Sequence, residues 1–169
     1  LAPAIELAER GFVIDPGLAS YLADQATFFH DTWPTTAAIF TPDGRAPAAG
    51  SRLRQPALAN TLQLITSTER AATGRGRAIA IQYARNAFYR GPIAEPILRF
   101  MDAANAEVLA AERGQLAPDR HVGRLTLAGP AYLSREDLSG YVGHMEEPVS
   151  IEFCGLTVCK CGPWTQGPV

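Results

Sequence analysis

The stretch Asn86-Ala-Phe-Tyr-Arg-Gly-Pro-Ile-Ala-Glu95 places the end of one helical pattern directly before the start of another. Gly91 can adopt the left-handed conformation that ends a helix, and Pro92 has the fixed φ that suits the first turn of the next one. Bulky apolar side chains stand just before both residues. The stretch therefore predicts a corner between two helices and not an active site.

Two helices are predicted at the start of the chain. The first covers Pro3–Arg10 and ends at Gly11. Asp15 followed by Pro16 is typical of an N-cap and the first residue of a second helix, which ends before Trp33. One face of this second helix has the i, i+3, i+4, i+7 spacing, and consists of Leu18, Tyr21, Leu22, Gln25, Ala26 and Phe29.

A loop region follows. Ile39-Phe40 is predicted to be a short extended segment before a turn at Thr41–Gly44, because proline and Asp-Gly favour turn dihedrals. Gln55-Pro56 then begins a third helix, which fades near Thr66–Thr68. Its apolar face consists of Leu58, Leu62 and Ile65.

A helix on each side leads into and out of the corner. Thr73–Arg77 is predicted to be a flexible break, after which a helical face of Ile79, Tyr83 and Ala87 leads to Gly91. Because proline past the first turn removes a backbone donor, we expect one turn over Pro92–Glu95 and a restart at Pro96. The face of that helix consists of Ile97, Phe100, Met101, Ala104 and Val108.

The last part of the chain predicts one short helix and one hairpin. Ser134–Asp137 has the form of a capping box, and its helix reaches about Tyr141. Pro148–Phe153 and Leu156–Cys159 alternate apolar and polar residues around a two-residue turn, which indicates a β-hairpin. In the polar stretch before them, Arg124–Leu127 has the composition of a short strand. The predicted fold class is mainly α with a small C-terminal β-hairpin.

Composition limits the classes of protein. A chain of 169 residues with 47% apolar and 19% charged residues is long enough for one domain with a real core, and its formal charge of −2 gives no overall attraction to nucleic acid or to an anionic membrane. We find neither an apolar run long enough to span a membrane nor a signal peptide. Both ends have the character of cuts, so we expect a piece of a longer protein whose compartment is unknown, with a helical section at 1–147 and a hairpin plus the start of another element at 148–169.

Three cysteines lie close together in the predicted hairpin and after it. The spacing of Cys154, Cys159 and Cys161 lacks the paired C-x2-C half-sites of zinc ribbons, and no histidine is near enough in sequence to complete a metal site. A disulfide within the hairpin is an alternative. We favour partly buried thiols that act as small apolar side chains.

The remaining chemical groups have ordinary structural interpretations. His30, His121 and His144 stand apart, so no local motif supplies a nucleophile, a base and an orienting group. The acid pairs Glu136/Asp137 and Glu146/Glu147 are explained as helix-start and loop residues.

Arginines are concentrated before the corner. No acid interrupts the stretch between residues 70 and 90, which contains Arg70, Arg75, Arg77, Arg85 and Arg90. They suggest phosphate or RNA binding, but the aromatic residues among them fit packing better. We therefore expect no nucleic-acid partner and assign no catalytic, substrate-binding or metal-binding residue and no cofactor.

Several stretches in a fixed order resemble the large subunit of γ-glutamyltransferases. They are Leu1–Phe12, Ala38–Phe40, Arg54–Ala59, Ala87–Glu95, and Leu133–Tyr141 leading to Glu147-Pro148 and the glycine hairpin. Each is weak by itself, but together they cover nearly the whole chain.

The resemblance implies a fragment of an N-terminal-nucleophile hydrolase, the αββα superfamily, made as a precursor that cuts itself into two subunits. A threonine at the new N-terminus attacks a γ-glutamyl amide, such as that of glutathione, with its own α-amine as base, and the acyl group passes to water or an amino acid. Leu1 is no such nucleophile, and the resemblance places the threonine beyond Val169. The expected partners are the rest of the precursor and, in the parent protein, a small γ-glutamyl substrate.

Two alternative functions stay open. In the first, the parent is a related acylase that deacylates amides such as β-lactam side chains. In the second, this chain is a non-catalytic helical interaction module that uses its arginines.

Overall fold

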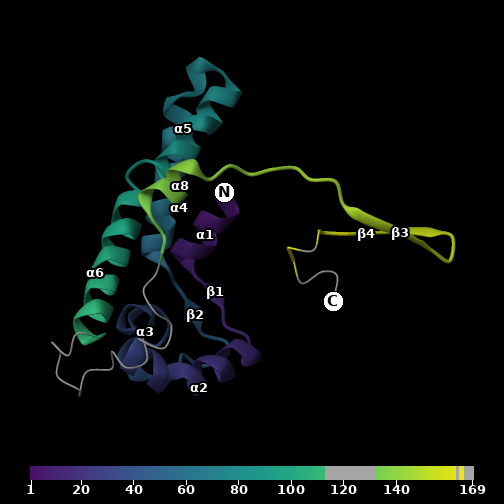
Figure 1. Cartoon of the computed structure of the whole chain (residues 1–169). Helices are drawn as coiled ribbons and strands as arrows, with labels where there is room; N and C mark the ends of the chain where they lie inside the picture. Colours follow the sequence, from purple (N-terminus) through teal and green to yellow (C-terminus); the bar gives the residue numbers. More distant parts are fainter. Residues whose placement is uncertain (113–131, 163, 166–169) are drawn as a thin grey trace.

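The computed structural model describes residues 1–112, 132–162 and 164–165. These residues form a helical body from which a β-hairpin extends on a long connection (Figure 1). The helical elements are α1 (Ala2–Arg10), α2 (Pro16–Thr32), α3 (Pro34–Phe40), η1 (Pro42–Gly44), α4 (Pro56–Ala71), η2 (Thr73–Arg75), α5 (Arg77–Tyr89), α6 (Ala94–Glu112) and α8 (Arg135–Gly140). The strands are β1 (Phe12–Val13), β2 (Arg52–Leu53), β3 (Val149–Phe153) and β4 (Leu156–Lys160). The predicted fold class is confirmed.

Both ends of the α1–α2 connection follow the predicted chemistry. Gly11 has φ 82° and ends α1. The Asp15 side chain accepts hydrogen bonds from the backbone N–H groups of Gly17 and Leu18, so it is the N-cap of α2. The two N-terminal helices are confirmed.

A small sheet that the sequence did not predict holds this connection in place. β1 pairs with β2 in antiparallel register, Phe12 opposite Leu53. The Arg52 guanidinium also donates to the Gly11 carbonyl oxygen at 2.9 Å. Strands of two residues are too short to show an alternating pattern, which explains why sequence analysis missed them.

The expectation of an extended segment at Ile39-Phe40 is wrong, because both residues belong to α3. Trp33 precedes Pro34 at the first helical position, and the helix buries Ala37 in the same cluster as Leu22 and Phe29 of α2. Burial of this apolar face outweighs the weak helix preference of the β-branched residues. The turn is confirmed, with positive φ at Asp43 and Gly44.

Helices α4 and α5 contact each other, and their buried residues are alanines, not the larger residues that we expected. The buried alanines are Ala59 of α4 and Ala80, Ala84 and Ala87 of α5. Leu58, Ile79 and Tyr83, which were predicted to face the core, are 45%, 47% and 42% exposed. Small side chains let two helix backbones approach closely. Ala59, Ala80 and Ala84 therefore lie one position after the large residues that were predicted to be buried.

The limits of α4 also differ from the prediction. The helix continues through Thr66–Thr68 to Ala71, because the hydroxyl groups there donate to carbonyl oxygens one turn back and leave the backbone bonds intact. The predicted flexible break at Thr73–Arg77 is a 3-10 turn, η2, followed by Gly76 with φ 96°.

At the corner, two expectations are wrong. Gly91 does not have positive φ; instead a Cβ there would lie 3.1 Å from the Ala87 Cα, so close backbone approach is what favours glycine. Pro96 does not restart a helix, since α6 begins at Ala94 and places Pro96 in its first turn, where a backbone N–H has no helical partner.

The remaining predictions concern α6 and the last part of the chain. Phe100 was predicted on the apolar face of α6 but is 58% exposed, whereas Ala94 and Leu98 of this helix are buried. The capping box and the hairpin are confirmed. The predicted strand Arg124–Leu127 lies outside the described residues. Among the described helices, none is both long and apolar enough to cross a bilayer.

We predict that Gly11→Ala destabilises the chain by at least about 1 kcal/mol, because its Cβ would lie 2.9 Å from the Leu53 carbonyl oxygen at a positive φ. Gly74→Ala is the matched control: nothing lies within 4 Å of its added Cβ. Chemical denaturation compares the two variants. Equal stabilities would contradict the role of Gly11.

Candidate functional site

The first feature that could carry function is the place where the chain returns to the corner. Nε and Nη2 of Arg90 donate to the Ser139 carbonyl oxygen at 3.0 and 2.7 Å. Arg85 donates to the Tyr141 carbonyl oxygen, and its guanidinium lies 4.9 Å from the Tyr89 ring centroid. Arg85 of α5 and Arg90, the C-cap residue of that helix, thus supply donors to carbonyls at the C-terminal end of α8, where intrahelical donors end. We call this contact the arginine latch.

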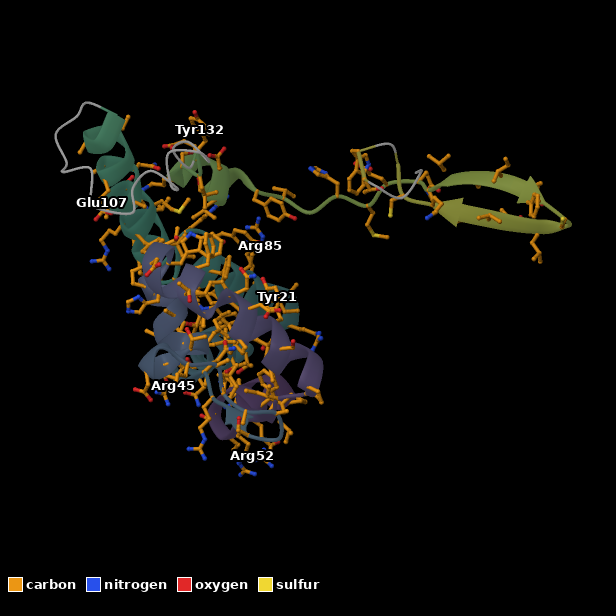
Figure 2. All side chains as sticks on the ribbon, turned by 90° about the horizontal axis from the view of Figure 1, so that it is seen from below. Tyr21, Arg45, Arg52, Arg85, Glu107 and Tyr132 are labelled. Atoms are coloured by element: carbon orange, nitrogen blue, oxygen red, sulfur yellow. The ribbon has the colours of Figure 1, made fainter. Side chains whose placement is uncertain are left out.

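Aromatic and apolar contacts reinforce the latch. The rings of Tyr89 and Tyr141 stack with centroids 5.4 Å apart. Ala94, Leu98 and Leu138 form a buried cluster against which Tyr89 packs. In Figure 2, Arg85 lies where the helical body meets the start of the extended connection.

The N-terminal end of α8 is held by a separate set of polar contacts. The Ser134 hydroxyl and the Asp137 carboxylate form the predicted capping box, and hydrogen bonds from Ser134 hold the pKa of Asp137 below its usual value. Arg135 donates two hydrogen bonds to Glu95, at 2.5 and 2.9 Å. These bonds, with the positive charge, lower the pKa of Glu95. Because both side chains are about half exposed, this ion pair orients α8 more than it stabilises the fold.

The second feature is the hairpin. We use the name arm for residues 141–160, which comprise the hairpin and the connection that precedes it. Every residue of β3 and β4 is exposed. Phe153 pairs with Leu156 and Ile151 with Val158, and directly opposite residues share one face of a hairpin. The turn has positive φ at Cys154 and Gly155, as a two-residue turn requires. One face of the arm is therefore apolar and has no partner among the described residues.

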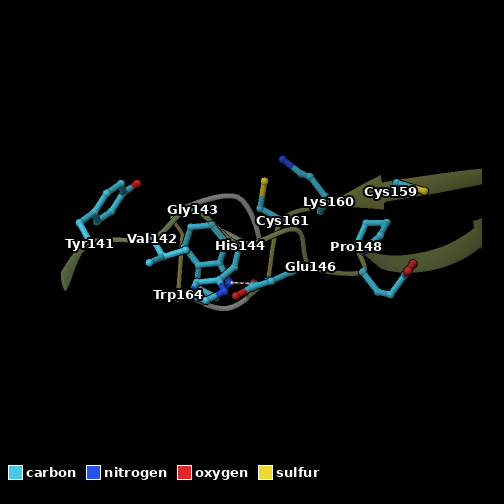
Figure 3. Close-up of a pocket in the computed structure, with 12 residues that line it drawn as sticks. Tyr141, Val142, Gly143, His144, Glu146, Pro148, Cys159, Lys160, Cys161 and Trp164 are labelled. Atoms are coloured by element: carbon cyan, nitrogen blue, oxygen red, sulfur yellow. Dashed lines mark hydrogen bonds between the residues drawn. The ribbon is translucent and has the colours of Figure 1, made fainter. Parts of the chain in front are cut away.

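The base of the arm contains a shallow depression between its connection and the end of β4 (Figure 3). The Trp164 indole N–H donates to the Glu146 carboxylate at 2.8 Å across it. His144, Cys159 and Cys161 also line this depression. The described residues contain no group of three ligating side chains placed to share a metal ion.

The structure separates the residues that the sequence singled out. All three cysteines are free and exposed, so the expectation of partial burial is wrong: no described residue outside the hairpin covers them. His30 and His144 are exposed as expected, while His121 lies outside the described residues. No hydrogen bond between described residues joins a histidine to a cysteine or serine side chain. This part of the chain contains no preformed nucleophile and base.

The acids and arginines have structural roles where the structure describes contacts. Glu136 and Asp137 lie in the first turn of α8, and Glu147 is exposed in the connection. Arg75 donates to the Tyr83 hydroxyl at 2.7 Å. Sequence analysis missed the latch, because Ser139 lies 49 residues from Arg90 and only the fold brings them together. The signal that could have predicted the latch is the short helix itself, because the carbonyl groups at its C-terminal end need hydrogen-bond donors.

Comparison with known proteins matches the whole chain to one family model. The model described as gamma-glutamyltranspeptidase covers residues 1–169. The glutathione hydrolase proenzyme of Pseudomonas sp. strain A14 is 29% identical over 169 residues, which are 100% of this chain and 22% of that protein. The chain spans about a quarter or less of the length of the curated relatives it matches.

Solved structures agree with this match. The structure of LmbA2991HD superposes with a TM-score of 0.76 at 29% identity, covering 99% of this chain and 26% of that one. Cephalosporin acylase from Bacillus halodurans gives a TM-score of 0.63 at 29% identity, covering 96% of this chain and 24% of that one.

We predict that Arg90→Met, which keeps the aliphatic stem but removes the donors, lowers stability by about 0.5–1.5 kcal/mol and speeds hydrogen exchange of the Leu138 and Tyr141 amides. Arg10→Met is the control, since it removes only an exposed ion pair with Glu6. Unchanged exchange in α8 of the Arg90 variant would show that the latch does not hold this helix.

Proposed function

Because this chain belongs to the gamma-glutamyltranspeptidase family, we propose that its parent protein transfers or hydrolyses γ-glutamyl groups of glutathione-type amides. The match of the family model to the whole chain carries this proposal. It is supported by relatives that are named glutathione hydrolase proenzymes.

The proposed chemistry is acyl transfer through an N-terminal threonine outside this chain. Cleavage of the precursor frees the α-amine of that threonine, which takes the hydroxyl proton as the oxygen attacks the γ-glutamyl carbonyl. The amine of the leaving group departs with a proton, and an ester remains. Water or the amino group of an acceptor then releases the γ-glutamyl group and restores the hydroxyl. No residue of this chain is assigned a catalytic or substrate-binding role, and no cofactor is assigned.

The proposed role of this chain is to support the arm and to present it to the rest of the precursor. Ile151 and Phe153 are each 67% exposed and Leu156 is 69% exposed, all on one face. A lone two-stranded hairpin is marginally stable in water, so this face needs a packing partner. The partner is the remainder of the same protein, and the division at residues 147 and 148 separates the supporting helices from the element that docks.

A second candidate function is amide deacylation of the acylase type. The likeness to cephalosporin acylase favours it, at the same identity as the likeness to LmbA2991HD. Both candidates use the same acyl-enzyme chemistry and differ in the acyl group that is accepted.

We predict that the full-length gene product appears as two subunits after maturation and cleaves a γ-glutamyl anilide faster than the matching glutaryl anilide. The two substrates differ only by the α-amino group, so the ratio of kcat/KM separates the two candidates. The 169-residue chain alone is the negative control and should release no aniline from either substrate. An active, unprocessed single band would contradict the N-terminal nucleophile, and faster glutaryl cleavage would favour the acylase.

We also predict that Ile151→Glu in the full-length precursor reduces the yield of soluble, processed enzyme severalfold, because a buried unpaired carboxylate is unfavourable. Ser150→Glu is the matched control, since Ser150 lies on the polar face. Band intensities after expression measure both. Equal processing of the two variants would show that the apolar face of the arm does not dock.

A further inference from the structure

Two thiols lie near each other at the base of the arm. Cys159 is in β4, opposite Ser150, and Cys161 directly follows Lys160, the last residue of this strand. Both cysteines are free and exposed, and both line the shallow depression there (Figure 3). The proposed acyl-transfer chemistry uses neither of them. We call these two residues the thiol pair.

The thiol pair lies on the face of the arm that is turned away from the docking face. Cys159 is opposite Ser150, which places it on the polar face, whereas Ile151 and Val158 are on the apolar face. Because side chains two positions apart along an extended chain share a face, Cys161 belongs to the same side as Cys159. Docking of the apolar face on the rest of the protein therefore leaves the thiol pair on the other side of the hairpin.

The spacing of the thiol pair suits an inserted metal ion better than a direct disulfide. Two positions along an extended strand separate the Cα atoms by about 6–7 Å. This separation is at the upper end of the range of about 4.4–6.8 Å that disulfides require. Two sulfur atoms on opposite sides of one metal ion lie about 4.6 Å apart, which is twice a metal–thiolate bond of about 2.3 Å. Rotation about the Cα–Cβ bond of each cysteine brings the sulfur atoms toward this separation.

The number of ligands selects the ion. No three ligating side chains of the described residues are placed to share a metal ion, so the pair acts as a site of two ligands. Structural Zn²⁺ takes four ligands. Cu⁺ is a soft ion that prefers thiolates and is stable between two of them. A Cu⁺ ion with two thiolates has a net charge of −1, and Lys160, between the two cysteines in the lining of the depression, supplies a positive charge beside it.

We propose that Cys159 and Cys161 bind one Cu⁺ ion as a two-coordinate dithiolate site. Each thiol loses its proton as its sulfur bonds to the ion, so binding releases two protons and changes no oxidation state. Cys154 takes no part, because it lies in the turn at the opposite end of the hairpin. The proposal does not depend on the acyl-transfer activity.

Competition with the colorimetric Cu⁺ chelator bathocuproine disulfonate tests the site on the reduced, full-length protein without oxygen. We expect the thiol pair to withdraw one equivalent of Cu⁺ from the chelator. Cys159→Ser and Cys161→Ser should each weaken this binding at least about 100-fold, because a single thiolate loses the gain from holding the ion at two points. Cys154→Ser is the matched control and should leave binding unchanged. Zn²⁺ should not displace the Cu⁺ ion.

A second measurement uses the unmodified protein and so does not depend on the folding of a variant. Alkylation by iodoacetamide, read by mass spectrometry, should be slowed by Cu⁺ at Cys159 and Cys161 and not at Cys154. Equal protection of all three thiols would show adventitious binding and overturn the proposal. So would single variants that each lose only half of the bound Cu⁺, or the absence of Cu⁺ uptake because another part of the protein covers the thiol pair.

Discussion

The hydrogen bonds from Arg90 to the Ser139 carbonyl oxygen decide where the last part of the chain leaves the helical body. Helix α8 has six residues, too few to be stable by its own backbone bonds. It is held at its N-terminal end by the capping box and the Glu95 ion pair, and at its C-terminal end by the arginine latch. Removing either set would leave α8 held by polar contacts at one end only.

The latch depends in turn on the corner between α5 and α6. Close approach at Gly91 lets α6 begin directly after α5, so the residues that precede the corner and Glu95 after it face the same short helix. The buried alanines of α5 allow α4 to pack near it and keep α5 fixed. The helical body is thus a support whose most specific contacts are at the start of the arm.

Exposure is distributed unevenly over this support. The helices bury their small residues, whereas the arm leaves all ten strand residues in solvent. In a family whose members are named proenzymes, an apolar hairpin on a firmly held base is consistent with an element that docks elsewhere in the same protein.

Local chemistry in the sequence predicted much of the fold. Asp15-Pro16, Gly11, the Ser134 capping box and the Cys154-Gly155 turn each specify a backbone conformation through their own residues, and each is confirmed. The ordered stretches that resemble γ-glutamyltransferases also led to the correct family.

The predictions from the sequence that were wrong concern features that depend on distant residues. Ile39 and Phe40 are helical because α3 packs against α2. Ala59 is buried and Leu58 is not, because the contact between helices, and not the hydrophobicity of each residue, decides which face is buried. Of the candidate site, the sequence predicted the hairpin but not the latch. By itself the sequence determined caps, turns and family, since these depend on neighbouring residues. Only the tertiary structure decided which faces are buried and which arginines hold α8, since those depend on contacts across dozens of residues.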